Sequence, residues 1–538
     1  MVSIKFNSRR SEVYAKGGMV ASSQPLATAA GLKILEKGGN ATDAAVATAA
    51  ALNVTEPTST GIGGDAFALY YSVDQGRVEG INGSGRAPAN LSIEKLRELG
   101  IEDLHPYSVH TITVPGAAAC WVDTVERWGT MELKEVLEPA INLAEQGFPV
   151  APITSLAWAR GAMNQLKGPN AGELLLNGRP PRAGEIMRNP NLARTFRELA
   201  ENGKDGFYEG WVAEAIVERI SQEGGLMTLD DLKNHRSTFD DPISVNYRGI
   251  DIYEIPPNGQ GITALIGLNI LENFDVSSMA HNSVEHLHVL IEAMRLAFAD
   301  TRWYVADPEV VDVPINELIS KDYAKERAQL ISMERATADV QKGSPVTSSD
   351  TVYFSVADRY GNACSFINSN YMGFGTGKIP KGTGFTLQNR GHNCSLDPNH
   401  PNALAPNKRP YHTIIPGMAT KDGELYASFG VMGGFMQPQG HVQVISNMID
   451  FGMNAQEALD APRFCIMDGT ANGIIALEDG IAIETMAGLA AMGHMIRPMV
   501  GTGRAIFGRG QIIRRDPQSG VLEGGSDPRA DGLAMGLI

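Results

Sequence analysis

Thr351 stands where a polar stretch gives way to a run of alternating apolar residues. The stretch 332–350 lacks sustained apolar periodicity and is expected to be an exposed, mobile connection. A threonine hydroxyl is a poor nucleophile unless a base lies beside it, and the α-amine of a new chain end can be that base, with an unperturbed pKa of about 8. Cleavage of the peptide bond between Asp350 and Thr351 would therefore create a nucleophile. Taken alone, a threonine at such a junction is nearly always structural.

Short motifs accompany Thr351 in a fixed order. TVYFSVADRYGNA begins at Thr351, and GFGTG, NKRP, a Gly-Gly pair and APR follow it. Before it come GGNATDAAVA, EPTSTGIGGDAF, TVPGAAACW and EPAINLAEQGFPV. Each fragment is unspecific, but the ordered set resembles the γ-glutamyltranspeptidase family of N-terminal nucleophile hydrolases over nearly the whole chain.

The resemblance implies an α+β fold of four layers, αββα, in which two central antiparallel sheets lie between helices. One precursor would yield a large chain, 1–350, and a small chain, 351–538, which begins at the catalytic threonine. The two chains would associate as one intertwined structural domain. A dimer of such heterodimers is a further arrangement that the resemblance allows.

Four catalytic residues follow from the resemblance. Thr351 would be the nucleophile for both self-cleavage and substrate turnover, Ser369 would orient the new amine, and Gly433 and Gly434 would form the oxyanion hole with their N–H groups. Arg86 falls where the family has an arginine that binds the substrate's α-carboxylate, for which a planar guanidinium is well suited. Without the resemblance, Ser369 would be interpreted as an ordinary strand serine, Gly433 and Gly434 as a turn, and Arg86 as a solvated surface residue.

Five further candidate residues depart from the family pattern. Members that handle γ-glutamyl groups supply acidic and amide side chains to the substrate's ammonium, but here Arg390 and Asn393 occupy the matching positions. A cation beside an ammonium is repulsive. His412 and Thr413 replace a usual pair of serines, and Tyr371 stands where asparagine is common. All five are candidate substrate-binding residues.

The arginines favour a compact anionic acyl group, such as a dicarboxylate or an α-keto acid amide, over a zwitterionic glutamyl group. The expected activity is that of a self-processed γ-glutamyltransferase or glutathione hydrolase-like amidohydrolase, whose acyl-enzyme on Thr351 is released by water or an amine. An acylase or oxamate-type amidohydrolase acting on a small anionic amide is the alternative. An unprocessed, non-catalytic scaffold is the alternative from another class. No cofactor and no metal are expected.

Bulk composition restricts the partners. The 538 residues are 43% hydrophobic and 20% charged, as in a soluble globular protein. A net charge of −16 opposes nucleic-acid binding. No run of eighteen apolar residues and no apolar segment of a signal peptide is seen, so neither membrane insertion nor export is expected, and the predicted location is cytoplasmic. The expected partner is a small-molecule amide or γ-glutamyl substrate.

Two rival sites are disfavoured. In the run from Gly373 to Lys378, Met372 and Ile379 fill the places where a phosphate-binding P-loop needs glycine and Ser/Thr. Three histidines do not share one helical face and lack the HExxH arrangement, so they are expected to be solvated helix residues rather than zinc ligands: His281, His286 and His288.

Periodicity predicts the elements that must position these residues. Helices are expected at 24–54 as a hairpin broken by Gly-Gly-Asn, and at 115–147, 282–306, 441–452 and 484–493. Strands are expected at 65–73 and 76–84, on both sides of a turn at 357–362, and at 414–421, 424–432, 473–478 and 510–515.

Overall fold

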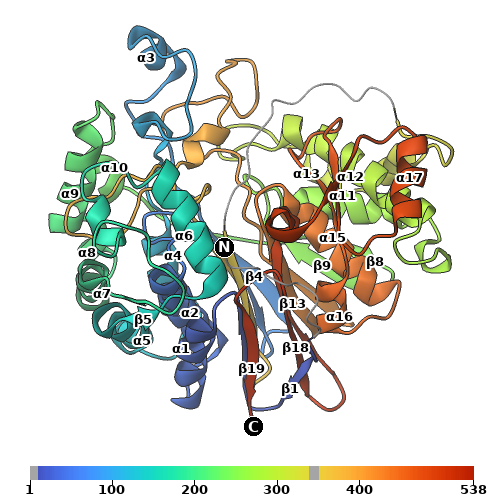
Figure 1. Cartoon of the computed structure of the whole chain (residues 1–538), viewed down its shortest axis with the longest axis horizontal. Helices are drawn as coiled ribbons and strands as arrows, with labels where there is room; N and C mark the ends of the chain where they lie inside the picture. Colours follow the sequence, from blue (N-terminus) through green and yellow to red (C-terminus); the bar gives the residue numbers. More distant parts are fainter. Residues whose placement is uncertain (1–9, 338–350) are drawn as a thin grey trace.

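Two antiparallel sheets of seven strands each form the centre of the protein (Figure 1). The structure is a computed structural model that describes residues 10–337 and 351–538. One sheet has the order β1-β18-β17-β13-β12-β9-β8, with strands Val13–Ala15, Leu522–Ser526, Arg509–Arg515, Glu424–Met432, Gly417–Lys421, Ile250–Glu254 and Ile243–Tyr247. The other has the order β19-β2-β10-β11-β3-β4-β7, with strands Leu533–Leu537, Gly18–Ser22, Val352–Asp358, Ala363–Ser369, Asp65–Ser72, Arg77–Gly83 and Thr238–Asp240. Each sheet combines strands from both sides of Thr351.

Helices cover the outer face of each sheet, on opposite sides of the molecule in Figure 1. On the β2-β10-β11-β3 face, α1 (Pro25–Glu36), α2 (Ala41–Thr55) and α4 (Ala117–Trp128) contact the strands, and α5 (Leu133–Gln146) packs on α2. On the other sheet, α11 (Gly261–Leu271) packs against β8 and β9, α15 (Met436–Ile449) against β13, and α16 (Ala455–Asp460) against β17 and β18, while α12 (Val284–Tyr304) packs on α11. The predicted αββα sandwich is confirmed.

A third apolar cluster fills the space between the sheets. It includes Phe67 and Ile367 from one sheet and Met418 and Ile513 from the other, all fully buried. Because alternate side chains of a strand point to opposite faces, the central strands bury both faces and are apolar almost throughout. β10 and β11 are buried at every position, which holds their ends, and therefore Thr351 and Ser369, in fixed places.

The helical hairpin predicted at 24–54 is present as α1 and α2. The side chain of Asn40 caps α2 and forms a capping box with Asp43, so the helix begins where Gly-Gly-Asn interrupts the chain. Alanine-rich packing brings the two helices close together, and a Cβ at Gly31 would lie 2.3 Å from Thr48 Oγ1. The small residues of this hairpin therefore permit a thin, tight layer against β10 and β11.

The remaining elements surround this core. The other helices are α3 (Ile93–Glu98), α6 (Pro152–Asn164), α7 (Pro190–Asn202), α8 (Asp205–Tyr208), α9 (Gly210–Ser221), α10 (Leu229–Lys233), α13 (Ile315–Leu318), α14 (Lys321–Ala328) and α17 (Ile483–Ala491). Two small sheets pair β14 (Phe464–Ile466), β15 (Ile475–Glu478) and β16 (Ile496–Met499), and β5 (Phe148–Pro149) with β6 (Ile186–Met187). In the part of the chain that is described, no helix has the length and apolar character needed to cross a bilayer.

Candidate active site

Thr351 directly precedes β10 and is fully buried. Its Oγ1 lies 3.1 Å from Oγ of Ser369, at the end of the neighbouring strand β11. The antiparallel register, which pairs Val352 with Asn368, brings these two hydroxyl groups together at one end of the sheet. Asp350 lies outside the described residues, as does the predicted connection from residue 338 onward. The structure therefore shows the surroundings of the candidate nucleophile, but not the bond predicted to be cut.

Tyr371 links the hydroxyl pair to the candidate substrate-binding residues. Its backbone N–H donates to Ser369 Oγ at 2.9 Å. Its φ of 76° is strained for a bulky side chain, at a cost of roughly 1–3 kcal/mol, and such strain is concentrated at functional sites. Burial raises the pKa of Tyr371 to about 12, so its hydroxyl remains a hydrogen-bond donor at neutral pH. That hydroxyl has no hydrogen-bond partner among the described residues.

Arg390 is completely buried beside Tyr371, with its guanidinium carbon 4.6 Å from the centre of the tyrosine ring. Nη1 donates to Oγ1 of Thr413 at 2.6 Å, whereas Nε and Nη2 find no partner in the described chain. Asn393 Nδ2, from the same 3-10 turn, is likewise buried and unpartnered within the described residues. Burial lowers the pKa of Arg390 to about 10, against the attraction of Asp65, and the side chain remains a cation at neutral pH.

Asp65 balances this buried charge from the start of β3. It accepts hydrogen bonds from His412 Nε2 at 3.0 Å, Gln388 Nε2 at 2.9 Å and Gly85 N at 3.0 Å. Burial alone would raise its pKa, but the contacts with His412 and the charge of Arg390 outweigh burial, and the pKa of Asp65 is lowered. Burial and Arg390 lower the pKa of His412 to about 3, so His412 is neutral and donates to the carboxylate. His412 therefore holds Asp65 in place.

Gly433 and Gly434 lie between β13 and α15. Their φ angles are 134° and 60°, in the region that glycine enters without a steric penalty, which explains the residue type at both positions. The cap residue of the following 14-residue helix, Phe435, supplies no side-chain cap. Backbone N–H groups and the positive end of the helix dipole favour a developing negative charge at such a place.

Sequence reasoning missed Gln260, which connects the glycine pair with Thr413. Gln260 Nε2 donates to the carbonyl oxygens of Gly434 and Thr413. The roles of Asp65 and Gln388 were also missed. Asp65 lies inside the GGDAF motif and Gln388 two residues before Arg390, but only the fold brings both to His412 and Arg390.

Comparisons with known proteins agree with this geometry. A family model described as gamma-glutamyltranspeptidase matches residues 27–537. The chain belongs to the gamma-glutamyltranspeptidase family. The glutathione hydrolase-like YwrD proenzyme of Bacillus subtilis is 38% identical, covering 96% of this chain and 98% of that protein. The oxamate amidohydrolase proenzyme of Klebsiella pneumoniae is 32% identical over 96% of this chain and 98% of its own. The crystal structure of a cephalosporin acylase from Bacillus halodurans superposes with a TM-score of 0.93 and 46% identity, covering 100% of this chain and 98% of that one.

Membership of the gamma-glutamyltranspeptidase family makes this chain an N-terminal nucleophile enzyme of the hydrolase and transferase type. The family's relatives are named as proenzymes, so a precursor processed into two associating chains is the form to expect.

Arg86 does not join the network around Thr351. Within the described structure its Nη2 pairs with Oε2 of Glu309 at 2.8 Å, and Arg409 lies 3.8 Å from the same carboxylate. An incoming carboxylate would therefore compete with Glu309 for Arg86. Binding of the substrate's α-carboxylate by Arg86 therefore stays a prediction.

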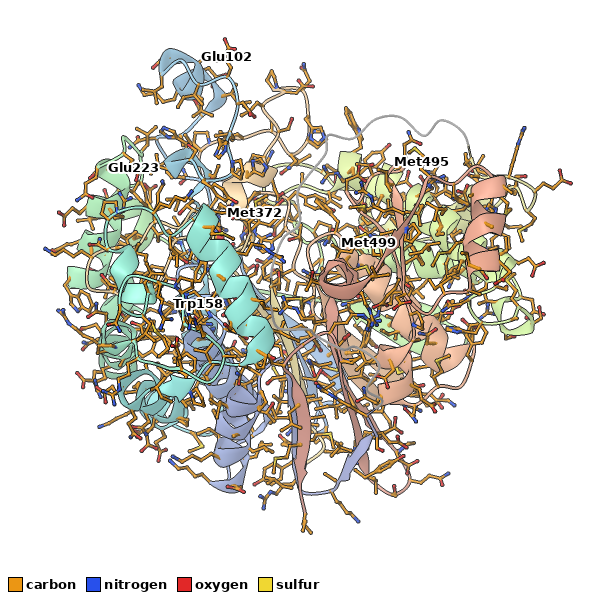
Figure 2. All side chains as sticks on the ribbon, viewed as in Figure 1. Glu102, Trp158, Glu223, Met372, Met495 and Met499 are labelled. Atoms are coloured by element: carbon orange, nitrogen blue, oxygen red, sulfur yellow. The ribbon has the colours of Figure 1, made fainter. Side chains whose placement is uncertain are left out.

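The glycine-rich run from Gly373 to Lys378 has a packing role in this family member. No helix follows it as a P-loop requires, since the next described element is the short 3-10 turn at Arg390–Asn393. Lys378 Nζ pairs with Glu223 at 2.5 Å. Met372 lies near the C-terminal end of α6, the helix that carries Trp158 (both labelled in Figure 2). There, Nε2 of Gln165 donates to the backbone carbonyl of Met372 at 3.2 Å.

The prediction that three helix histidines are solvated is wrong. His286 and His288 are buried in α12, and His281, which precedes the helix, is half-buried. His286 packs edge-on against Phe451, and His281 Nε2 lies 2.9 Å from Asn447 Oδ1. The sequence misled because α12 is buried on nearly all sides, so that a polar residue on it does not mark a solvent-facing side.

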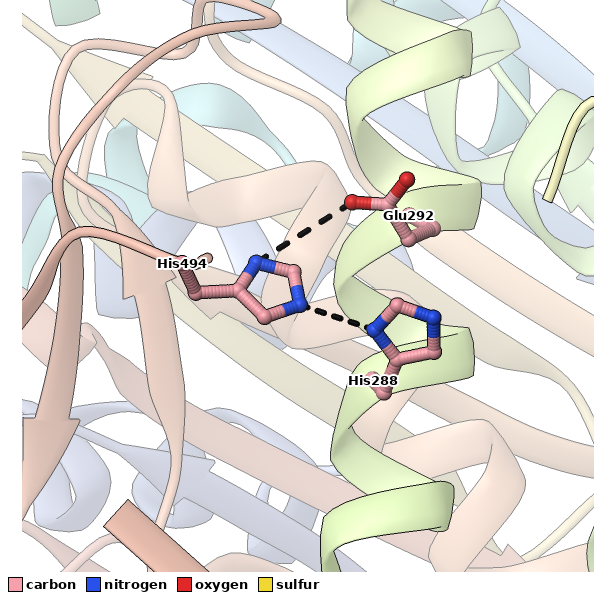
Figure 3. Close-up of side chains that lie close together, drawn as sticks. All are labelled: His288, Glu292 and His494. Atoms are coloured by element: carbon pink, nitrogen blue, oxygen red, sulfur yellow. Dashed lines mark hydrogen bonds and ion pairs between the residues drawn. The ribbon is translucent and has the colours of Figure 1, made fainter. Parts of the chain in front are cut away.

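His288 belongs to a buried group with Glu292 and His494, whose donor atoms lie within 4.8 Å of one another (Figure 3). His288 Nε2 must donate to the carbonyl of Ser332, at 2.7 Å, because a carbonyl only accepts. His288 Nδ1 is then an acceptor, and His494 Nε2 donates to it at 2.8 Å. The hydrogen bond between the two rings therefore occupies nitrogen atoms that a metal ion would need as ligands.

Glu292 is also engaged by protein groups. Arg295 Nη1 lies 3.1 Å from one carboxylate oxygen, and the backbone N–H of Thr337 donates to the other at 2.9 Å. A dication would have to displace a proton and share this carboxylate with an arginine, so these contacts favour a structural role. The group fixes residues 332–337, the last ones described before Thr351, to α12.

Replacing His286 by glutamine should flatten the dependence of stability on pH. Burial lowers its pKa to about 3, against an unfolded value of about 6.5. Between these values the unfolded chain binds one more proton, so the free energy of unfolding rises with pH and is lost as pH falls below 6.5. His286→Gln should remove about 1.4 kcal/mol per pH unit from that slope between pH 5 and 6. Urea unfolding at both pH values measures it, and an unchanged slope would contradict the burial argument.

Proposed function

We propose that this protein is a self-processed amidohydrolase that transfers a small, carboxylate-bearing acyl group from an amide to Thr351 and then to water. The observation that carries the proposal is the buried guanidinium of Arg390, which has two nitrogen atoms without partners among the described residues. It lies against Tyr371, whose N–H contacts the Ser369 hydroxyl beside Thr351. Two residues, Tyr371 and Ser369, therefore connect the site proposed for the acyl carboxylate with the nucleophile Thr351.

Four unpartnered atoms at Arg390 and on nearby residues can donate hydrogen bonds: Nε and Nη2 of Arg390, Nδ2 of Asn393 and the hydroxyl of Tyr371. Two acceptors, Oε1 of Gln388 and Oδ1 of Asn370, are also unpartnered among the described residues, so donors are in excess. Buried polar groups are almost always satisfied, so a cluster of donors favours a ligand rich in acceptors. A carboxylate fits a guanidinium in bidentate geometry. The ammonium of a γ-glutamyl group would instead meet a cation, which argues for the oxamate-type or acylase alternative over glutathione hydrolysis.

The mechanism uses the residues in this order. After scission, the α-amine of Thr351 accepts the Oγ1 proton while the oxygen attacks the substrate carbonyl, and Ser369 orients the amine. The N–H groups of Gly433 and Gly434 stabilise the oxyanion. The amine then protonates the leaving nitrogen, an ester with Thr351 remains, and water attacks it with the amine again as base. We propose water, rather than an amine, as the acceptor.

The substrate assignment is tested with a panel of amides. The mature protein is given γ-glutamyl p-nitroanilide, glutaryl p-nitroanilide and oxamate, and product release is followed. We expect turnover of a compact anionic amide and weak turnover of the γ-glutamyl compound. Strong γ-glutamyl turnover would overturn the anion-selective assignment and support the glutathione hydrolase-like alternative.

Processing separates this proposal from a non-catalytic scaffold. We propose that the precursor divides into a large chain, 1–350, and a small chain, 351–538, which stay associated, with a dimer of these heterodimers as one further assembly. Denaturing electrophoresis should show two bands of roughly 38 and 20 kDa, at about 110 Da per residue. A single full-length band in purified material would favour the scaffold. Size-exclusion chromatography with light scattering reports the assembly.

A further inference from the structure

Gln260 lies at a junction between the acyl-binding residues and the glycine pair. It is fully buried immediately before α11. Its Nε2 donates to the carbonyl oxygens of Thr413 at 2.6 Å and Gly434 at 2.9 Å, and its Oε1 accepts from the hydroxyl of Tyr411 at 3.0 Å. Its backbone N–H donates to the carbonyl of His412 at 2.9 Å. Both the side chain and the main chain of Gln260 are thus fixed.

We propose that Gln260 is a positioning residue that holds Gly434 so that the N–H groups of the glycine pair face the reacting carbonyl. This inference rests on the proposed function, which assigns those N–H groups to the oxyanion. Gln260 also joins this pair to the acyl-binding side, since Thr413, whose carbonyl it binds, accepts from Arg390 Nη1. Three hydrogen bonds therefore connect the carboxylate site with the oxyanion site.

The glycine pair needs such a tether. Two successive glycines at positive φ have no side chain that could restrict them, and their backbone is the most mobile type. An oxyanion hole stabilises the transition state only if its donors are oriented beforehand, within about 0.5 Å and 10–20°. The carbonyl of Gly434 is otherwise bonded by the N–H of Gln437 at 3.2 Å, from the following helix. The bond from Gln260 is the shorter of the two and comes from a different element.

The test variant is Gln260→Glu, which keeps the shape of the side chain but replaces two N–H donors by an oxygen facing two carbonyl oxygens. Steady-state kinetics of the mature variant on glutaryl p-nitroanilide should show kcat about 100-fold lower, because loss of one oxyanion donor typically costs 10²- to 10³-fold. KM should stay within about 3-fold, since Arg390, Asn393 and Tyr371 are unchanged. The self-cleavage rate of freshly purified precursor should fall in parallel.

Gln443→Glu is the matched control. Gln443, on α15, is also a buried glutamine whose Nε2 donates to two backbone carbonyls, those of Gln439 and Phe464. It should show a similar change in melting temperature with kcat within about 3-fold of the unchanged protein. Tyr411→Phe removes the bond to Gln260 Oε1 together with the contacts of the same hydroxyl with Thr263, Thr301 and Arg302, and should lower kcat by less than about 5-fold.

A kcat for Gln260→Glu no lower than that of Gln443→Glu, or a rise in KM that accounts for the whole loss, would overturn the positioning role. Should Gln260→Glu not fold, Gln260→Met removes the donors without adding charge and is judged by the same criteria. Absence of Thr351-dependent turnover in the unchanged protein would defeat the proposed function itself. Unimpaired Gln260 variants of an active enzyme would defeat only the inference drawn from this residue.

Discussion

Thr351→Ala should yield a single full-length chain without amidase activity. The substitution removes the oxygen that both scission and acyl transfer require, and loss of a nucleophile typically costs at least about 10⁴-fold in rate. Thr351→Ser, which retains a hydroxyl at the same position, should keep measurable scission and turnover. Intact-mass spectrometry of freshly purified protein reports scission, and the glutaryl amide assay reports turnover.

Thr420→Ala is the control for this pair of variants. Thr420 is a buried threonine on β12 whose hydroxyl lies 3.5 Å from that of Tyr253, outside the contacts of Thr351. It should process fully and turn over at the normal rate. N-terminal sequencing of the mature small chain should begin Thr-Val-Tyr-Phe. A different N-terminus in active material would show that another residue is the nucleophile.

The sequence predicted the layers of the fold because each layer carries a local signal. The α1–α2 hairpin has alanine-rich helices and a capping asparagine, and β3, β4, β10 and β11 show apolar runs bounded by turns. The strands at the two chain ends, β1, β2, β18 and β19, were not predicted. They are three to five residues long and are held in the sheets by partners distant in sequence, so no local periodicity indicates them.

The candidate site was predicted unevenly for a similar reason. Thr351 and Ser369 could be predicted because the motifs that contain them resemble a family, and the register of β10 and β11 then joins them. The ring contact of Arg390 with Tyr371 and the tie of Gln260 to Gly434 join residues 19 and 174 positions apart. Such contacts depend on loops whose geometry is set by the whole fold. The left-handed backbone of Tyr371 has no local signal either, since aromatic residues avoid that region.

Arg390→Met should change the substrate preference. The two unpartnered nitrogens of Arg390 would each form a charge-assisted hydrogen bond with an acyl carboxylate. Their loss costs about 3 kcal/mol, or roughly 100-fold in kcat/KM for glutaryl p-nitroanilide. Pentanoyl p-nitroanilide, which has the same chain length without the carboxylate, should change by less than about 3-fold. Arg390→Lys should recover only part of the loss, because an ammonium cannot bind a carboxylate in bidentate geometry.

The pair of substrates separates recognition from damage to the site. A general disturbance, such as the release of Asp65 or Thr413 from the buried charge, would lower both rates together. A loss of turnover for glutaryl p-nitroanilide alone would show that the guanidinium of Arg390 binds the carboxylate of the acyl group. Equal losses for the two amides would contradict the assignment. If Arg390→Met gains γ-glutamyl turnover, the buried cation of Arg390 excludes the α-ammonium of the γ-glutamyl group. The replacement of this one side chain would then explain why some family members accept γ-glutamyl substrates and this one does not.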